Sequence, residues 1–358
     1  KPDIVHLNDY QTALVAAYLR RLYVEEPRLA KPALVYSIHN LAYQGVFAAD
    51  RLTTMGFEPA LCEHPSPFEF HGNVNLMKIG IDLADVVNTV SPRYAEEIRG
   101  AEQGAGLEGL LDASADKLFG ILNGIDTTIW DPATDPELPY AFHVDRMSGK
   151  RGCKAALLSE AGISLDRLDR PLFGMVGRLV AQKGVDLVLQ VADELVGRDV
   201  GLIVLGSGAS DLEEGLRALA ARHPDRVGVR IGFDNGLAHR ITAGADFFLM
   251  PSRYEPCGLN QMYAMRYGTI PIVKRTGGLA DTVQHWNPVT HEGTGFLFDE
   301  SEAVSMARAI LSALEAYRDR AGWDQLRRNA MAQDFSWDRS AKDYINLYDE
   351  ALCRHREP

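Results

Sequence analysis

One segment of this sequence combines a carboxylate with the start of an expected helix. Residues 251–261 read PSRYEPCGLNQ, and they follow an apolar run that ends at Met250. A helix is expected to begin near Gly258, where unpaired backbone N–H groups carry partial positive charge and can hold sugar hydroxyls or a phosphate. Glu255 lies just before that helix, where its carboxylate could accept hydrogen bonds from a sugar diol or stabilise developing positive charge. The alternative is a helix-capping Glu255 beside a structural Pro256, and the local sequence leaves both readings open.

Two cations flank a second turn. Arg178 and Lys183 lie in GRLVAQKG, residues 177–184, between an expected strand at 172–176 and an expected helix at 184–195. Both side chains could therefore converge on a cleft. A departing nucleoside diphosphate gains negative charge, so fixed cations would stabilise the transition state more than the ground state. Arginine offers a bidentate fork and lysine a compact charge. The alternative is a pair of solvated loop side chains, which is what a lone RxxxxK spacing usually is.

Two ring-bearing residues also follow expected strands. His39 comes at the end of the strand at 34–38, where it could donate to a sugar hydroxyl, although a lone histidine is more often structural. Phe233 follows the strand at 227–231 and could stack on a base, although such an aromatic is more commonly part of the core.

Glycines recur after strands, in Gly206-Ser207-Gly208 and in Thr276-Gly277-Gly278. Close approach of the backbone to a nucleotide is plausible at both places. Neither matches the full G-x-G-x-x-G dinucleotide fingerprint, so as isolated signals they are weak.

Short β-branched runs alternate with longer amphipathic segments along the chain. Strands are expected at residues 4–7, 34–38, 86–90, 118–122, 172–176, 202–205, 227–231, 247–250 and 270–273. Helices are expected at residues 12–23, 184–195, 211–221, 237–243 and 259–267. This alternation predicts parallel βαβ units that bind ligands at the carboxyl ends of their strands.

The alternation falls into two halves, which predicts an α/β fold with two Rossmann-like domains facing a cleft. Residues 131–145 are rich in Pro and Asp and are expected to lead into a connection between the domains. The expected domains are residues 1–145 and 168–335. The last segment, 336–358, is expected to form a helix that packs back on the first domain.

Composition excludes several functional classes. The net charge is −12, from 37 basic and 49 acidic residues, whereas a general nucleic-acid binder would carry a basic stripe. No apolar run approaches the roughly 20 residues that span a bilayer. Cys62, Cys153, Cys257 and Cys353 show no paired metal-site spacing and suit a reducing cytoplasm. A bacterial cytoplasmic location is expected, with a plastid as the alternative if a transit peptide is missing.

Read together, these segments resemble the family of bacterial glycogen synthases and plastid starch synthases. The similarity runs in the family's order through IHNLAYQG, NLMKIGIDLAD, LNGID, GRLVAQKG, PSRYEPCGLNQ and KRTGGLADTV. It implies the two-domain GT-B glycosyltransferase architecture. It also implies transfer of glucose from ADP-glucose to the non-reducing 4-hydroxyl of an α-1,4-glucan, either glycogen or a maltooligosaccharide. No metal ion or other cofactor is expected.

The resemblance further implies that the α-configuration is kept. The leaving diphosphate itself could deprotonate the incoming hydroxyl on the same face, so no side-chain nucleophile is required; a covalent intermediate is left open. The residues expected to be catalytic are His39, Arg178, Lys183 and Glu255. Arg178 and Lys183 would grip the diphosphate, and His39 would help to position the glucose. The other residues implied to contact substrates are Asp9, Asn123, Phe233, Glu255, Cys257, Gly258, Leu259, Thr276, Gly277 and Gly278.

This sequence departs from the family in three respects. The family's first-domain Lys-Thr-Gly-Gly-Leu segment is absent, and the only TGGL here is at residues 276–279. Asn8 and Tyr10 flank Asp9 where many relatives have His and Trp. The family normally has a further segment before the position of Lys1, so the first domain is expected to be incomplete. The isolated chain is therefore expected to be inactive or poorly soluble.

Two rival functions remain at this point. One is a non-catalytic glucan-binding or regulatory fragment on the same scaffold. The other is a sugar-nucleotide transferase with a different acceptor, against which EPCGLNQ and TGGLADTV argue. ADP-glucose is favoured over UDP-glucose by the resemblance alone, and the sequence leaves the oligomeric state open.

Overall fold

The structure is a computed structural model that describes residues 1–29, 31–63 and 65–356. It divides into two compact units. Unit 1 comprises Lys1–Asn123 and Asp338–Pro358, and unit 2 comprises Gly124–Trp337. The first domain was expected to extend to residue 145, whereas residues 124–145 belong to unit 2. Residues 357–358, the end of the expected segment 336–358, lie outside the described residues.

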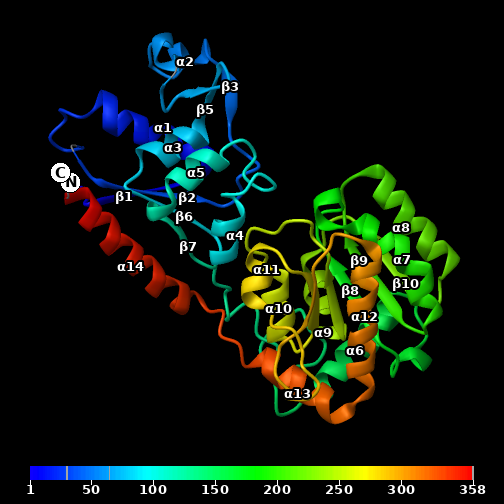
Figure 1. Ribbon diagram of the computed structural model, residues 1–358. Coiled ribbons are helices and arrows are strands. Elements are labelled where there is room, and N and C mark those ends of the chain that lie inside the picture. Colours follow the sequence, from blue (N-terminus) through cyan, green and yellow to red (C-terminus); the bar gives the residue numbers. More distant parts are fainter. Residues whose placement is uncertain (30, 64, 357–358) are drawn as a thin grey trace. The chain divides into compact units, whose positions relative to one another are not determined.

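A parallel sheet forms the centre of unit 1. Its strands are β1 (Ile4–Asn8), β2 (Ala33–Ile38), β6 (Val86–Thr89) and β7 (Leu118–Gly120). In the described part of the unit they lie in the order β1–β2–β6–β7 (Figure 1). Every residue of β2 is buried, as expected for a strand of a parallel sheet that is covered on both faces. The four strands expected in this half are confirmed, with ends shifted by a few residues.

Unit 1 also contains helices. They are α1 (Asp9–Ala17), α2 (Arg51–Thr54), α3 (Leu76–Leu83), α4 (Pro92–Glu97), α5 (Glu108–Ala113) and α14 (Trp337–Arg356). Asn75 caps α3 by accepting a hydrogen bond from Lys78 N, and Ser91 caps α4 in the same way. The expected helix at 12–23 starts earlier, at Asp9, and its last part is a π-helical turn at Tyr18–Leu22.

Helix α14 packs on the sheet of unit 1. Its Leu347 and Ala351 are buried in one cluster with Ala33, Val35 and Val86. The C-terminal helix thus covers strands from the other end of the chain (Figure 1).

A small antiparallel sheet in unit 1 was not expected. Its strands are β3 (Val46–Ala48), β4 (Glu69–Phe70) and β5 (Asn73–Asn75), which pair in the order β3–β5–β4. Strands of two or three residues are too short to show a two-residue alternation, so sequence periodicity could not reveal them.

Unit 2 contains a larger parallel sheet. Its strands are β8 (Leu172–Val176), β9 (Gly201–Gly206), β10 (Val227–Ile231), β11 (Phe247–Met250), β12 (Ile270–Lys274) and β13 (Phe296–Phe298). Among the described residues of the unit the order is β10–β9–β8–β11–β12–β13. The strand order reverses direction at β8 and β11, and parallel sheets bind ligands at the carboxyl ends of strands beside such a switch point. The expected strands are confirmed; β13 was not expected.

Helices cover the sheet of unit 2 (Figure 1). They are α6 (Ser148–Glu160), α7 (Val185–Gly197), α8 (Ser210–Arg222), α9 (Asn235–Gly244), α10 (Asn260–Arg266), α11 (Gly277–Thr282), α12 (Ala303–Arg318) and α13 (Arg320–Met331). The buried residues of α7 recur at helical spacing, which turns one apolar stripe toward the sheet. Together the two units give the expected α/β class with two Rossmann-like domains.

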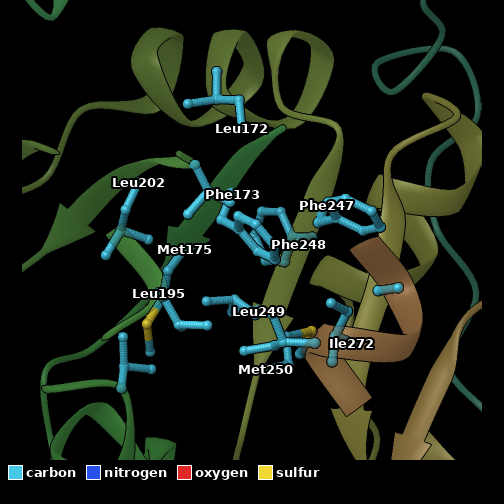
Figure 2. Close-up of a cluster of buried hydrophobic side chains, with 14 of the residues drawn as sticks. Leu172, Phe173, Met175, Leu195, Leu202, Phe247, Phe248, Leu249, Met250 and Ile272 are labelled. Carbon is cyan, nitrogen blue, oxygen red and sulfur yellow. The ribbon is translucent and has the colours of Figure 1, made fainter. Parts of the chain in front are cut away.

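The core of unit 2 is built around β8 and β11. Figure 2 shows Phe173, Phe247 and Phe248 between aliphatic side chains of neighbouring elements. The rings of Phe173 and Phe247 stack with centroids 4.9 Å apart, at a position where β8 and β11 are in register. This packing fixes the strands from which the candidate site extends.

Residues 131–145, expected at the end of the first domain, are part of unit 2. Asp135 is buried in unit 2, where its Oδ2 lies 2.7 Å from His239 Nδ1 and accepts a hydrogen bond of 2.6 Å from Tyr267 Oη. The Pro and Asp content of the segment led us to expect that it leads into a connection between the domains, whereas Asp135 anchors it on His239 of α9 and on Tyr267, which follows α10.

None of the described helices is both long enough and apolar enough to cross a membrane.

Candidate functional site

Loops from the carboxyl ends of β8, β11 and β12 meet in unit 2. Arg253 N donates a hydrogen bond of 2.8 Å to Gln182 O, which joins the loop after β11 to the loop after β8. Gly278 N donates at 3.1 Å to Glu255 O, which joins the turn after β12 to the loop after β11. Three of the segments singled out in the sequence on this half, at residues 177–184, 251–261 and 276–278, therefore form one contiguous structure.

An ion pair lies at the centre of these loops. Lys183 Nζ is 2.5 Å from Glu255 Oε2, and Ser252 Oγ donates to the same oxygen at 2.9 Å. The Glu255 side chain is 9% exposed and that of Lys183 is 22% exposed. Burial away from water strengthens such a charge pair and holds both groups in place. The lysine and the glutamate predicted separately are thus direct partners.

Glu255 does not cap the helix that follows it. Helix α10 begins at Asn260, later than expected, and its N-cap residue Leu259 makes no side-chain capping hydrogen bond. The carboxylate of Glu255 is instead engaged with Lys183 and Ser252. The helix-capping alternative is therefore wrong.

A second ion pair supports the first. Arg253 donates to both carboxylate oxygens of Asp186 on α7, at 2.8 and 2.6 Å. The hydrogen bond from Arg253 holds the pKa of Asp186 below its usual value, so the pair stays charged near neutrality. Lys274 Nζ donates at 2.9 Å to the carbonyl of Arg253. Sequence reasoning missed these residues, although Arg253 lies inside the segment that it singled out.

Arg178 lies beside a pocket rather than at the ion pair. Its side chain is exposed, and Nη2 lies 3.5 Å from Gln182 Oε1. With Phe233 and Trp130 it lines a pocket of about 360 Å³ between the ends of β8 and β9, called here the Phe233 pocket. Lys183 and Glu255 are not among the residues that line it.

Phe233 is 93% exposed at the Phe233 pocket, so the alternative that it belongs to the core is wrong. An exposed ring beside a pocket of small-ligand size can stack on a planar group. Trp130 lines the same pocket and is sandwiched between the rings of His239 and Tyr263, at centroid distances of 3.7 and 3.8 Å.

Backbone contacts explain the glycines after β12. A Cβ on Gly277 would lie 2.1 Å from Glu255 O, and one on Gly278 would lie 2.1 Å from Cys257 O. Only glycine permits this approach, so the turn is held directly against the Glu255 loop. Thr276 and Cys257 are buried here, Gly258 is half-buried and Leu259 is 36% exposed.

The remaining predicted residues lie in unit 1. Asp9, at the carboxyl end of β1, has a φ of 57°, which is uncommon for a residue other than glycine. Its Oδ1 accepts a hydrogen bond of 2.9 Å from His39 N, and His39 Nε2 is 2.9 Å from Asn8 Oδ1. Strained residues of this kind cluster at functional sites. Asn123 is half-buried just beyond β7.

His6 lies behind this cluster. Burial, and then the nearby charge of His39, lower the pKa of His6. His6 Nε2 is 2.6 Å from Ser37 Oγ and Nδ1 is 3.0 Å from Tyr348 Oη on α14. The C-terminal helix is thereby linked to the strands that carry Asp9 and His39.

Two family models match the chain. The model described as "Starch synthase catalytic domain" matches residues 1–113, and the model described as "Glycosyl transferases group 1" matches residues 161–330.

In residues 1–29, 31–63 and 65–356, no group of three or more His, Cys, Asp or Glu is placed to hold a metal ion.

Relatives match nearly the whole chain. A glycogen synthase of Anaeromyxobacter sp. (strain Fw109-5) is 50% identical over 97% of this chain and 73% of its own length. The glycogen synthase of Thermotoga maritima is 46% identical over 99% of this chain and 73% of its own length.

A solved structure shares the fold. The catalytic domain of starch synthase IV from Arabidopsis thaliana, bound to ADP and acarbose, is 36% identical. The two structures superpose with a TM-score of 0.92, and the match covers 99% of this chain and 73% of the starch synthase IV chain. Its likeness confirms the expected GT-B glycosyltransferase fold. With the sequence identities above, it shows that the chain belongs to the family of glycogen synthases and starch synthases, glycosyltransferases that act in glycogen and starch synthesis.

Proposed function

We propose that the chain moves glucose from ADP-glucose to the non-reducing 4-hydroxyl of an α-1,4-glucan, with retention of the α-configuration. The observation that carries this proposal is the part-buried Lys183–Glu255 ion pair at the meeting point of three strand-end loops, one of which also carries Arg178 of the Phe233 pocket. The ADP and acarbose bound to the related Arabidopsis starch synthase IV support a nucleotide donor and a glucan-like acceptor.

In this proposal unit 2 binds the donor. Phe233 stacks on adenine, while Arg178 and Lys183 neutralise the diphosphate as its bond to glucose breaks. Lys183 is held by Glu255 before the substrate arrives, so little reorganisation of this cation accompanies the reaction, whereas Arg178 is exposed and free to close on the diphosphate. The turn at Thr276–Gly278, held against the Glu255 loop, is assigned to the phosphates, and Glu255 with residues 257–259 binds the glucose hydroxyls.

Residues of unit 1 are assigned to the transferred sugar and the acceptor. His39 is held by its backbone bond to Asp9 and its ring contact with Asn8, which orients the imidazole to donate to a glucose hydroxyl. Asp9 and Asn123 are assigned to glucose or the acceptor end. As the bond between the anomeric carbon and the diphosphate breaks, a diphosphate oxygen takes the proton of the incoming 4-hydroxyl, and the 4-oxygen bonds to the anomeric carbon on the same face.

The proposed reaction uses no metal ion, because Arg178 and Lys183 supply the positive charge that a divalent cation would otherwise provide. Transfer is therefore expected to continue unchanged in EDTA. A loss of activity in EDTA that is restored by Mg²⁺ or Mn²⁺ would contradict this part of the proposal.

The test is glucose transfer from ADP-glucose to maltoheptaose by wild type, Arg178→Ala, Lys183→Ala and Arg198→Ala. Arg178→Ala and Lys183→Ala should each lower transfer at least tenfold, about 1.4 kcal/mol of transition-state stabilisation. Among the described residues Arg198 forms its ion pair with the exposed Glu194 on α7, and it serves as the matched control. Wild-type rates in both test variants would rule out the two-cation clamp.

The expectation from the sequence that the isolated chain is inactive is tested in the same assay. If there is no turnover, the variants are compared by calorimetric titration with ADP, UDP and maltoheptaose. ADP binding that exceeds UDP binding supports the proposed donor. Binding of maltoheptaose without either nucleotide would favour a non-catalytic glucan-binding protein.

A further inference from the structure

A second pocket lies at the opposite edge of the unit 2 sheet, where strands begin. Its volume is about 230 Å³, and α6 and α13 provide most of its lining. We call it the Lys150 pocket. Its charged lining residues are Lys150, Arg151, Lys154, Asp246, Arg320 and Arg327. Five cations therefore surround one carboxylate, in a chain whose net charge is −12.

Two buried ammonium groups form the floor of the Lys150 pocket. Lys150 Nζ donates to Ala243 O at 2.9 Å and to Thr269 Oγ1 at 2.6 Å. Lys154 Nζ donates to Arg170 O at 2.5 Å and to Asp246 Oδ2 at 2.6 Å. An ammonium has three donor hydrogens, so these contacts with described residues leave each group one hydrogen for a ligand or water.

Two arginines from α13 stand at the wall of the Lys150 pocket. The guanidinium of Arg320 lies over the ring of Tyr317 at 5.8 Å, and that of Arg327 lies over Trp323 at the same distance. Cation–π contacts of this kind orient a guanidinium without neutralising it. Arg327 also pairs with Asp324, but its Nε is buried and has no hydrogen-bond partner among the described residues. A buried unpaired donor costs free energy that an acceptor placed in the pocket could recover.

The lining matches one chemical class of ligand. Compact lysine charges below and planar arginine forks at the side are the groups that proteins use to bind tetrahedral oxyanions. Of the five cations, Lys154, Arg151 and Arg327 have carboxylate partners, in Asp246, Asp169 and Asp324. Lys150 and Arg320 have no carboxylate within ion-pair distance among the described residues, so their charges are available to an anion.

We propose that the Lys150 pocket is a binding site for a tetrahedral dianion, a phosphate group or sulfate, distinct from the donor-binding residues. The two sites lie at opposite ends of the same strands. Asp246 Oδ2 accepts from Leu172 N at the start of β8, and Ile270 N at the start of β12 donates to Asp246 O. Arg178 and Thr276, by contrast, follow the carboxyl ends of β8 and β12.

Calorimetric titration of the chain with sodium sulfate at constant ionic strength tests the proposal. Wild type should bind sulfate saturably, and Arg320→Gln should weaken binding roughly tenfold, the value of one charge-assisted contact. Arg318→Gln is the matched control, since Arg318 is exposed at the end of α12 and does not line the pocket. Arg151→Gln provides a second exposed variant in the pocket and should also weaken binding.

The donor-binding residues could also attract sulfate, so the titration is repeated with Lys183→Ala. Sulfate binding that survives Lys183→Ala and falls in Arg320→Gln supports the Lys150 pocket. Absence of saturable binding, or equal affinities in Arg320→Gln and Arg318→Gln, would overturn it. Inorganic phosphate and glycerol 3-phosphate then distinguish the source: binding of both indicates a phosphomonoester site, and binding of inorganic phosphate alone indicates a site for the free anion.

Proton uptake gives an independent readout. Burial lowers the pKa of Lys150 to about 7. The charges of Arg327 and Lys154 lower this pKa further, whereas Asp246 and Cys153 raise it. The Phe142 ring also faces the ammonium group. A bound dianion favours the charged ammonium and raises this pKa, so sulfate binding near pH 7 should take up protons. The uptake should vanish well below pH 7, where Lys150 is already charged, and the affinity for sulfate should fall as pH rises through 7.

Sulfate does not itself titrate in this range. Titrations in two buffers of different ionisation enthalpy measure the uptake, and proton release would contradict the assignment.

Discussion

Lys183 and Glu255 come from loops 72 positions apart in the chain, yet each is the other's charge partner. The sequence predicted both residues, because each follows a strand and carries a charge suited to a sugar nucleotide. It could not predict that they pair, because the pairing depends on the register of β8 and β11 in the sheet. It also missed Ser252, Arg253 and Asp186, whose roles depend on contacts between segments rather than on spacing within one.

Replacing Glu255 by glutamine should weaken both stability and transfer. The change leaves the partly buried Lys183 ammonium without its carboxylate, so the free energy of unfolding of unit 2 should fall by about 1–3 kcal/mol. Chemical denaturation measures this. Glu194→Gln, in an exposed pair with Arg198, should change stability by less than about 0.5 kcal/mol. Equal free energies of unfolding in the two variants would show that the Lys183–Glu255 pair does not stabilise unit 2.

Replacing Phe233 by alanine should separate binding from stability. The ring is 93% exposed, so its removal should leave the unfolding free energy nearly unchanged. Loss of stacking on adenine should weaken ADP affinity by about 1–3 kcal/mol. Val289→Ala, at an 88% exposed apolar residue outside the Phe233 pocket, is the control. Undiminished ADP affinity in Phe233→Ala would refute the stacking role.

At the scale of elements, helix α7 connects the site to the core. It begins after Gly184, whose φ is 68° and whose added Cβ would lie 2.1 Å from Pro251 O. At its other end Gly197 has open space around it. At Gly184 a side chain would collide with the backbone, whereas at Gly197 there is room for one.

Gly184→Ala should force the Lys183 loop away from the Glu255 loop. We expect a loss of about 1–3 kcal/mol in stability from the strained backbone, together with weaker ADP binding. Gly197→Ala should be neutral or stabilising by up to about 1 kcal/mol, because alanine favours the helix. Thermal unfolding and ADP titration of both variants measure this; similar behaviour of the two would contradict the proposed contact between the loops.

The accuracy of the predicted elements followed their length. β8, β10 and β11 were predicted to the residue, since each is a bounded apolar run of four or five residues. β3, β4 and β5 were missed because two or three residues show no period. The prediction for residues 131–145 was wrong because Pro and Asp are typical of linkers, whereas Asp135 of this segment is held by His239 and Tyr267 in unit 2. Composition cannot distinguish a solvated aspartate from a buried one with partners.

At the scale of the whole molecule, the two units have separate hydrophobic cores. The larger core cluster lies within unit 2, and unit 1 holds two others, of which one includes α14. All four tryptophans of the sequence fall within Gly124–Trp337. Trp337 is the first residue of α14 and lies at the boundary of the units, whereas the other three lie inside unit 2. Tryptophan fluorescence therefore reports mainly the unfolding of unit 2, while far-ultraviolet circular dichroism reports both units.

This distribution gives a prediction for ligand binding. If unit 2 binds ADP, ADP at about 100 times its Kd should stabilise the transition seen by tryptophan fluorescence by about 2.7 kcal/mol. Denaturant titration with and without ADP, followed by both signals, measures the shift. A fluorescence transition that ADP leaves unchanged would argue against donor binding by unit 2.

The most direct test of the account is calorimetric titration of ADP into wild type, Arg178→Ala, Lys183→Ala and the control Arg198→Ala. Wild type and the control should bind ADP saturably, and each of the other two variants should bind it at least tenfold more weakly, about 1.4 kcal/mol. If Arg178→Ala and Lys183→Ala bind ADP as tightly as wild type, these cations do not hold the diphosphate and the assigned donor site is wrong.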